Sequence, residues 1–550
     1  MGFVIRRSLP SLGGLVALLL AAGFAAVVFL EAPLWFPVGF AVAMLVVQFV
    51  VNPWVIQWLV PAGVVGRTAE GYDLDHPLGR IVADRCRAAG VPLVKLGIVD
   101  DGTPNAFTFG HSPRDARIWV TRGLLERLDE RELDAVVAHE VGHIKHWDFV
   151  VMTVAAVVPM VLYLVYLVAR GTNRPETRAV ALGAFVAYLL SQFTLLALSR
   201  ARETAADHWS CRTTGDGDAL ASALVKVAYG MGQVSAAHKA EVAALVERGK
   251  EGKTQARKQQ ARWNRAQSMR AMGIFEPRSA EAMEAAFARG LDPQRAMAAM
   301  RWDVVNPWGA TLEKLSSHPL VARRIQALEQ SGLPGAPRHW SALRAAATAP
   351  PHEVAAVRTR YSLELALAVL PWTILALLLL TGFLTGTLLS VGLALVMAGI
   401  LFFVKQNVRY PSGFTPTDEV AGLLERIDAG PVTGIPVEVR GQVIGRGFPG
   451  YVLSPDLVIQ DSSGFVPLLY RQPIPFAGEW FGLVRAKKFM GQEVVARGWY
   501  RRQPGPVIEL REVTAADGTR ARAWEWLSRY VAAAAVLVAG VIVMLVAIAA

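Results

Sequence analysis

The chain has 550 residues, of which 53% are hydrophobic and 18% are charged, and its formal net charge is +11. The hydrophobic residues are concentrated in a few blocks, which excludes a wholly soluble protein and indicates membrane spans joined to water-facing domains. Two cysteines exclude a disulfide framework, and the positive charge fits cytosolic basic residues facing anionic lipid better than a nucleic-acid-binding surface.

Residues 1–60 are predicted to form an N-terminal membrane hairpin. The first span is the apolar run 12–30, which follows Arg6 and Arg7, so the N-terminus is expected in the cytosol. A cleaved signal peptide is the alternative interpretation of this run. A second apolar run, 36–60, follows after only a few residues and favours the hairpin.

Residues 61–360 are expected to form one domain that includes a second membrane hairpin at 149–198. Its water-facing start should contain one helix and three short strands, at 76–89, 93–99, 105–109 and 117–121. The stretch 199–360 is rich in alanine and helical in pattern. Within it the strongly basic segment 248–270 fits a solvated helix face, with contact to an anionic lipid surface or a regulatory partner as the alternative.

A helix with a clear start signal connects the soluble part to the second hairpin. Asp129 has the character of an N-cap, and Glu132 three residues later completes a capping box, so the helix is predicted from Glu130. We expect it to continue past Trp147 and Asp148 into the apolar residues that follow.

The second half of the chain adds a third hairpin and a β-rich region. Apolar runs at 363–382 and 384–404 predict the hairpin 361–405, and residues 526–550 predict a last transmembrane helix, which makes seven spans. Residues 406–525 are expected to be a linker followed by a small barrel. Its five strands are predicted at 436–445, 451–460, 464–470, 492–501 and 506–512.

The segment HEVGH, residues 139–143, lies in the helix predicted from Glu130. His139 and His143 are four residues apart, so they project from the same face of a helix and can hold one Zn²⁺. Glu140, beside the first histidine, can act as general base on water at the metal. The spacing therefore predicts zinc-dependent hydrolysis.

A catalytic zinc site needs a third protein ligand and an open position. Glu203, in the segment SRARETAAD after the apolar run 179–198, is the best candidate, and Asp207 lies one turn further on the same helix face. Asp207 can accept a hydrogen bond from a ligating histidine and so fix its tautomer. A structural zinc site would need a fourth ligand, for which Cys211 is the candidate.

These motifs resemble the membrane metalloendopeptidases typified by HtpX and the CAAX prenyl protease. The resemblance covers roughly residues 60–330 and rests on Asn105-Ala106-Phe107, HEVGH, SRARETAAD, and Ser317-His318-Pro319 followed by Arg324-Ile325. It implies a zincin-like (gluzincin) α+β catalytic domain in a multi-pass α-helical membrane protein. The chain departs from short HtpX-type proteins in its long 215–310 stretch and its additional C-terminal half.

The resemblance also implies roles for individual residues. His139, His143 and Glu203 would ligate zinc, Glu140 would be the base, and Asp207 would orient His139. His318 would stabilise the oxyanion, with Arg324 supporting the site. The segment Asn105, Ala106 and Phe107 would be the edge strand that binds an extended substrate through backbone hydrogen bonds.

The predicted barrel more weakly resembles the OB-like domains attached to membrane proteases and to NfeD-type proteins. The features that carry this are GQVIG at 441–445 and GFPG at 447–450. OB folds bind nucleic acid through aromatic residues in a basic groove, and Arg485, Lys487 and Lys488 adjoin two phenylalanines here. A protein-interaction or lipid-facing module is the preferred interpretation of a domain tethered between two spans.

Together these patterns predict a zinc endopeptidase of the inner (plasma) membrane, with its N-terminus and active site on the cytosolic side. Its substrates would be membrane or membrane-associated proteins, cleaved in protein quality control. The alternative is a non-enzymatic membrane scaffold whose OB-like domain recruits partners and whose zinc is inactive or structural.

Overall fold

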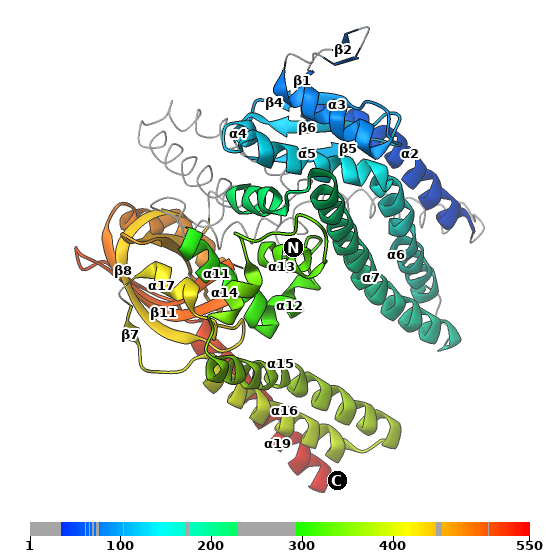
Figure 1. Cartoon of the computed structure of the whole chain (residues 1–550). Coiled ribbons are helices and arrows are strands. Elements are labelled where there is room, and N and C mark those ends of the chain that lie inside the picture. Colours follow the sequence, from blue (N-terminus) through cyan, green and yellow to red (C-terminus); the bar gives the residue numbers. More distant parts are fainter. Residues whose placement is uncertain are drawn as a thin grey trace. The chain divides into compact units, whose positions relative to one another are not determined.

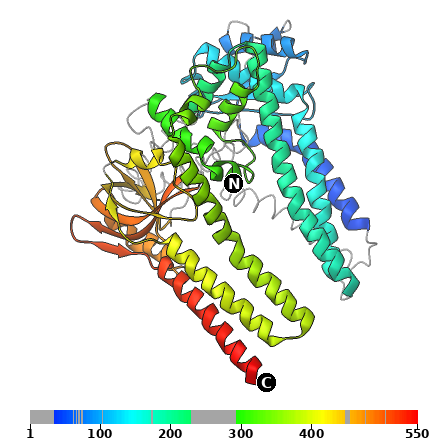
Figure 2. The ribbon, with the colours of Figure 1, turned by 60° about the horizontal axis from the view of Figure 1, so that its bottom comes forward.

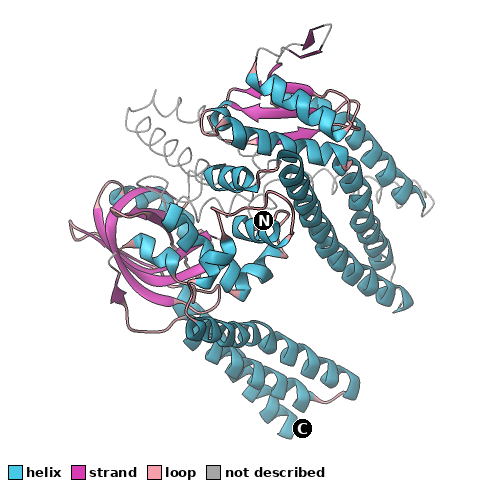
Figure 3. Cartoon of the chain, in the orientation of Figure 1, coloured by secondary structure: helices cyan, strands magenta, loops and turns pink. Residues whose placement is uncertain are grey.

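Figure 1 shows the computed structural model of the chain. It describes residues 35–60, 62–64, 67–68, 71–72, 76–102, 104–171, 175–227, 293–417, 419–446, 454–474, 476–503 and 505–549. The described residues divide into two compact units, one made of 35–227 and 311–343 and the other of 293–310 and 344–549. Each unit combines long helices with a β-structure (Figure 3). The predicted first span, 12–30, and the basic segment 248–270 lie outside the described residues.

The first unit is built from a small sheet and several helices. The strands are β1 (Gly63–Val64), β2 (Arg67–Thr68), β3 (Gly71–Tyr72), β4 (Lys95–Val99), β5 (Ala106–Phe109) and β6 (Arg117–Thr121). The helices are α2 (Trp35–Leu59), α3 (Pro77–Ala89), α4 (Arg122–Leu125), α5 (Glu130–Lys145), α6 (Asp148–Gly171), α7 (Pro175–Thr214) and α13 (Val321–Gln330). The predicted helix at 76–89 and the three predicted strands are confirmed.

The sheet has the strand order β1-β4-β6-β5, with β4 and β6 parallel and β5 antiparallel to β6. β5 is therefore at the end of the described sheet. Its side chains alternate between the two faces. Phe107 and Phe109 pack with Trp119 and with Ile56 of α2 on one face, while Thr108 is directed to α5. This alternation brings a polar side chain of an edge strand to the helix that carries HEVGH.

The helix α5 begins as predicted. The Asp129 side chain accepts a hydrogen bond from the Glu132 backbone N–H, and the Glu132 side chain accepts one from the Asp129 N–H, which completes the capping box. The end of the helix corrects the prediction, because α5 does not run on into the apolar stretch. It ends at Lys145, Trp147 adopts a left-handed backbone conformation with φ of 58°, and α6 starts at Asp148. A left-handed residue cannot continue a right-handed helix.

The chain returns from the second hairpin in one uninterrupted helix. α6 and α7 pack against each other, and α7 continues for 40 residues through the apolar run and the SRARETAAD segment. Its last turns pack against α5. Glu203 is therefore fixed on the same rigid element as the preceding apolar run.

The second unit contains three long apolar helices. These are α15 (Pro351–Thr385), α16 (Leu388–Arg409) and α19 (Glu525–Ala549), and α16 packs against both of the others (Figure 2). Gly399 on α16 lies so close to α19 that a Cβ there would be 2.7 Å from the Leu537 nitrogen, and Gly540 on α19 similarly approaches Val396. Such glycine contacts let apolar helices pack without a hydrophobic driving force.

Among the described residues, five helices are long and apolar enough to cross a membrane, and they are α6, α7, α15, α16 and α19. They coincide with the five predicted spans that follow residue 61. α2 is a helix at the position of the predicted span 36–60. Together with the comparisons below, these helices make the chain a membrane protein.

The β-rich region of the second unit is a closed barrel. Its strands are β8 (Ile435–Arg446), β9 (Leu457–Gln460), β10 (Phe465–Leu469), β11 (Glu493–Gln503) and β12 (Gly505–Ala515), in the order β10-β9-β8-β11-β12, and a parallel pairing of β10 with β12 closes the ring. β7 (Thr415–Pro416) and β13 (Arg520–Arg522) extend it at β8 and β12. Four of the five predicted strands are confirmed, and the one predicted at 451–460 is observed only at 457–460, with 451–453 outside the described residues.

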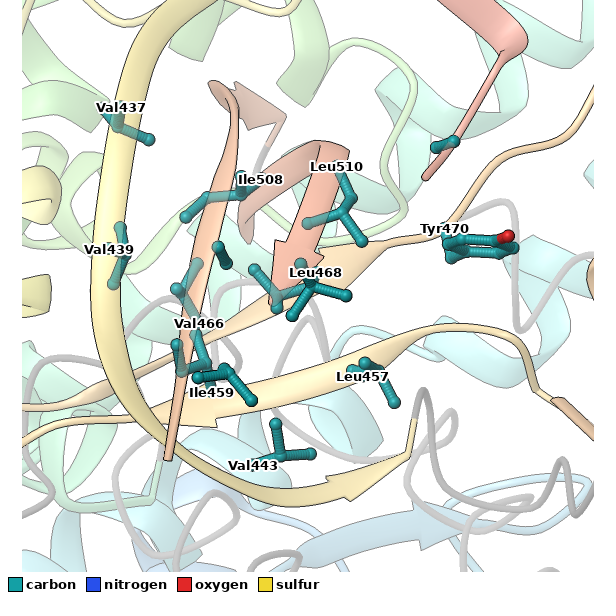
Figure 4. Packing of buried hydrophobic residues seen from close by; sticks show 14 of the residues in the cluster. Val437, Val439, Val443, Leu457, Ile459, Val466, Leu468, Tyr470, Ile508 and Leu510 are labelled. Carbon is teal, nitrogen blue, oxygen red and sulfur yellow. The ribbon is translucent and has the colours of Figure 1, made fainter. Parts of the chain in front are cut away.

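Alternating apolar residues fill the inside of this barrel. Figure 4 shows Val439, Ile459, Val466 and Leu468 directed into one interior, and all four are at most 1% exposed. Short helices complete the unit: α11 (Pro293–Val305), α12 (Pro307–Glu313), α14 (Ala342–Ala347), α17 (Val420–Glu425), α18 (Ala477–Val484) and the 3₁₀ helix η1 (Ala486–Phe489).

Candidate metal centre

Two histidines of α5 and one glutamate of α7 converge where these helices pack. The Nε2 atoms of His139 and His143 are 3.1 Å apart. Glu203 places one carboxylate oxygen 3.6 Å from His139 Nε2 and the other 3.6 Å from His143 Nε2. Among the described residues, these three side chains form a group that could share a metal ion. Such separations suit ligand atoms that each lie about 2.0–2.2 Å from one zinc ion.

The second ring nitrogen of each histidine lies beside a carboxylate. His139 Nδ1 is 2.9 Å from Asp207 Oδ1, and His143 Nδ1 is 2.5 Å from Asp148 Oδ2. A carboxylate at Nδ1 keeps the proton on that nitrogen, so each lone pair is on Nε2 and points into the shared space. Two lone pairs at 3.1 Å repel each other unless a cation lies between them. The donor set therefore fits Zn²⁺.

The surroundings of the three side chains also favour a cation. His139 is fully buried, and burial alone lowers the pKa of a histidine, but the neighbouring Asp207 and Glu203 outweigh this and raise its pKa to about 9. These carboxylates thus favour a positive charge at Nε2, which a metal ion would supply in place of the second proton. Glu203 Oε2 is buried without a hydrogen-bond donor among the described residues, and its basic neighbours His139 and Arg324 lie 3.6 and 3.8 Å away. An unpaired buried carboxylate oxygen costs free energy, which a bound metal ion would offset.

Asp207 is itself held by Arg324 of α13. The guanidinium donates from Nε to Asp207 Oδ2 at 2.8 Å and from Nη2 to Oδ1 at 2.5 Å. Both side chains are at most 2% exposed. The forked guanidinium matches the two carboxylate oxygens and fixes the direction in which Asp207 faces His139.

Asp148 was missed by the sequence reasoning. It is the first residue of α6, and the break at Trp147 returns its carboxylate to His143. Its other oxygen is 2.9 Å from Arg202 Nε, on the helix that carries Glu203. The sequence did show a carboxylate five residues after the second histidine. In the continuous helix that was expected, however, this carboxylate would not face His143.

Glu140 lies next to the three metal-binding candidates and is 2% exposed. The Thr108 hydroxyl of β5 donates a hydrogen bond to Glu140 Oε2 at 2.6 Å. Thr108 was not predicted, although it directly follows the segment Asn105, Ala106 and Phe107. Alternation along a strand was the signal that could have found it, because residues 106 and 108 share a face.

His318 also reaches the centre. Its Nε2 is 3.5 Å from Glu203 Oε1, and its Nδ1 is 3.0 Å from the Ser317 hydroxyl. Cys211 lies elsewhere, with its sulfur 3.6 Å from the Gly335 carbonyl oxygen. The described part of the chain therefore gathers three candidate ligands and one further histidine, and Cys211 does not supply the fourth ligand that a structural zinc site would need.

The predicted substrate-binding segment lies on and beside the edge strand. Asn105 precedes β5, where its carbonyl oxygen accepts a hydrogen bond from the Thr121 N–H and its own N–H donates to the Thr121 hydroxyl, and Ala106 and Phe107 begin the strand. The Phe107 side chain is 2% exposed and belongs to the core. Asn105 and Ala106 are also at most 4% exposed, so none of the three side chains is available at the surface.

Gly142, inside HEVGH, permits the close approach of the two helices. A Cβ at this position would lie 3.2 Å from the Ala206 Cα and 3.1 Å from Cδ1 of Trp209. Because α7 passes directly over Gly142, Glu203 can reach the two histidines of α5.

Comparisons with known proteins identify the family of the region that contains this centre. A family model described as peptidase family M48 matches residues 74–331. A protease HtpX homolog of Methanothermobacter thermautotrophicus is 36% identical over 217 residues, which cover 39% of this chain and 80% of that protein. One of Moorella thermoacetica is 34% identical over 251 residues, which cover 42% and 82%.

The match to the solved structure of S. mikatae Ste24p covers 40% of this chain and 56% of that chain. The sequence identity is 17% and the TM-score is 0.29.

Proposed function

The chain belongs to peptidase family M48 as a membrane metalloprotease with HtpX-like relatives, and we propose that it is a zinc-dependent endopeptidase acting on membrane or membrane-associated proteins. The observation that carries the proposal is the pair of Nε2 atoms of His139 and His143, 3.1 Å apart, with each Nδ1 beside a carboxylate. Because Glu203 is the third candidate ligand and no fourth is present among the described residues, a coordination position is left for water or substrate.

His139, His143 and Glu203 would hold Zn²⁺, which when bound polarises the scissile carbonyl and lowers the pKa of water. Glu140 takes the proton of the attacking water and delivers it to the leaving amine. The hydrogen bond from Thr108 occupies Oε2 of this carboxylate, which leaves Oε1 for the transferred proton. No covalent acyl-enzyme is required.

The remaining side chains of the centre position groups for this reaction. His318, with its Nε2 directed to the site, donates a hydrogen bond to the oxyanion that develops on the substrate carbonyl. Asp207 and Asp148 keep the two ligand histidines in the tautomer that presents Nε2. An extended substrate pairs with the backbone of β5, which is at the end of the described sheet.

We place the reaction at the cytosolic face of the inner membrane, in protein quality control. Two observations support the cytosolic side. Arg6 and Arg7 precede the first apolar run. The two cysteines are free and buried, as is common in a reducing compartment. Because Glu203 and Asp148 lie on the helices α7 and α6, substrates would be cut close to the bilayer.

The test compares the full-length wild type with Glu140→Gln. The variant should keep one zinc per chain by elemental analysis, because Glu140 is not among the ligands, and should lose about 10²–10⁴-fold or more in kcat/KM on an unfolded protein substrate. Glu130→Gln is the matched control, since Glu130 is an exposed residue at the start of the same helix, and it should retain full activity. His139→Ala should lose both zinc and activity.

Proteomics of membrane fractions that contain either the wild type or Glu140→Gln would identify the physiological substrates. Proteins that accumulate with Glu140→Gln and fall with the wild type are candidates. If Glu140→Gln cleaved at the native rate, the assignment of the base would be wrong. If the wild type itself cleaved nothing while still binding zinc, the scaffold alternative would be favoured.

A further inference from the structure

A cavity of about 340 Å³ lies in the second unit, between the barrel and the ends of two apolar helices. Its lining includes Arg409, the last residue of α16, and Arg529, near the start of α19. Both helices are candidate membrane spans. The cavity thus lies at the level where the chain would leave the bilayer, and its volume is in the range that holds a small ligand.

The charged groups around this cavity have a positive excess. Four arginines line it against three glutamates, Glu479, Glu509 and Glu525. Glu509 serves two of the arginines, since it is 3.0 Å from Arg501 and 3.2 Å from Arg409. One carboxylate serves both guanidinium groups, and Arg501 directs its remaining donors to the backbone carbonyl oxygens of Val432 and Arg409. The positive charge of this pair of arginines is therefore only partly neutralised.

The two remaining arginines are more accessible. Arg529 is paired with Glu525 at 2.7 Å and keeps 41% of its side chain exposed. Arg471 is exposed and has no ion-pair partner among the described residues. These two side chains can bind an anion that enters from outside.

An apolar surface continues from the cavity. We call it the 474–484 surface, and its exposed members, with their exposed fractions, are Ile474 (69%), Phe476 (80%), Trp480 (64%), Leu483 (49%) and Val484 (49%). Ile474 and Phe476 also line the cavity. Three exposed basic residues follow directly, at 485, 487 and 488. Aromatic and aliphatic residues next to lysine and arginine are typical of a segment that lies in a membrane interface.

We propose that this cavity binds the phosphodiester headgroup of an anionic membrane phospholipid. Arg471 and Arg529 contact the phosphate, the acyl chains lie along α16 and α19, and the 474–484 surface enters the interface beside them. The position of the cavity at the ends of two apolar helices favours a lipid over a free phosphate. A barrel on the cytosolic side would meet the leaflet that is rich in anionic lipid. An anionic headgroup matches the excess of arginine over glutamate in the lining of the cavity.

Native mass spectrometry of the full-length protein in detergent tests the proposal, with phosphatidylglycerol and phosphatidylcholine of the same acyl chains as probes. The wild type should retain phosphatidylglycerol and bind phosphatidylcholine several-fold more weakly. Arg471→Gln with Arg529→Gln should weaken phosphatidylglycerol retention by about fivefold for each arginine removed, roughly 25-fold in total. Lysine at both positions should restore most of it.

The matched control is Arg520→Gln, an exposed arginine of β13 that does not line the cavity. It should leave retention unchanged. Equal retention of both lipids by the wild type, or equal loss in the control and the double variant, would overturn the proposal. If the double variant does not fold, Arg471→Gln alone still tests the site, because this side chain is exposed, and an unchanged affinity would count against it.

A soluble headgroup separates the two sources of phosphate. Glycerol phosphate is added at the concentration at which phosphatidylglycerol saturates the protein. At that concentration it should not bind to the protein and should not displace phosphatidylglycerol. Binding as tight as that of the lipid would assign the cavity to a free phosphate compound and overturn the lipid assignment. Phe476→Ser with Trp480→Ser should weaken lipid retention several-fold, and unchanged retention would remove the 474–484 surface from the proposal.

Discussion

Asp148 Oδ2 lies 2.5 Å from His143 Nδ1, although a helix end and a left-handed tryptophan separate the two residues in the chain. The contact exists because α5 stops at Lys145 and the chain turns at Trp147 before α6 begins. The second histidine therefore has the same support as the first, which Asp207 holds at 2.9 Å. In both imidazoles the Nδ1 atom, on the side of the ring away from the candidate metal position, lies beside a carboxylate. The two carboxylates belong to different helices, α7 and α6.

Removing the charge of Asp148 should weaken zinc binding. Asp148→Asn is expected to lower zinc affinity by about 10–100-fold, because His143 would lose the carboxylate that orients its ring and raises its basicity. Competition with a chromogenic chelator measures the change. Asp100→Asn removes an exposed carboxylate paired with Arg122 and should leave the affinity unaltered. Equal affinities of wild type and Asp148→Asn would show that the contact does not support the metal.

A larger side chain at position 142 should separate α5 from α7. A Cβ there meets Ala206 at 3.2 Å, so Gly142→Val is expected to destabilise the first unit by about 1–3 kcal/mol. The zinc content should fall as well, because Glu203 would move away from the histidines. Thermal unfolding and elemental analysis measure both effects. Gly183→Val on α7, where nothing lies within 4 Å of the added Cβ, is the control, and an equal loss in both variants would contradict this explanation.

The forked ion pair between Arg324 and Asp207 should not tolerate lysine. A lysine keeps the charge but cannot make two parallel hydrogen bonds to the carboxylate, so Arg324→Lys should lower both stability and zinc affinity. Arg324→Ala should cost more, about 3–5 kcal/mol, because it leaves the Asp207 carboxylate buried and unpaired. Denaturant unfolding measures these changes. The neighbouring Arg323→Lys, which alters a partly exposed pair with Glu313, should have little effect, and a tolerated Arg324→Lys would argue against the fork.

The turn between β5 and β6 should contribute stability that is lost in acid. Burial opposes ionisation of Asp115, but hydrogen bonds from the His111 side chain and from the backbone N–H groups of Ser112 and His111 outweigh it and lower its pKa to about 2. Arg117 lies 3.5 Å away as a further positive group. Because the folded pKa is below the ordinary value, the contribution is complete above about pH 4 and disappears as the pH falls toward 2.

Asp115→Asn should therefore lower the unfolding temperature at pH 7 and approach the wild type as the pH is reduced below 4. Thermal unfolding in detergent between pH 7 and pH 3 measures the difference. A difference that stays constant over this range would mean that the Asp115 charge is not its cause.

Much of the fold was predictable because it depends on local regularities of the chain. The capping box at Asp129 and Glu132 fixed the start of α5, and the i, i+4 spacing placed His139 and His143 on one face, since both features lie within one or two helical turns. The five barrel strands were predicted from segments of alternating apolar and polar residues that Gly and Pro residues separate. The apolar runs gave the candidate spans in the same way.

Contacts between distant residues could not be obtained in this way. Thr108 reaches Glu140 across 32 residues only because the sheet packs on α5. Glu364 on α15 is 1% exposed and accepts a hydrogen bond from Trp308 Nε1 at 2.6 Å, across 56 residues of the chain. The sequence alone determined the ligand types, their spacing and the apolar segments. The tertiary structure decided which carboxylates meet the histidines, because that depends on a single left-handed residue and on the close approach of two helices at Gly142.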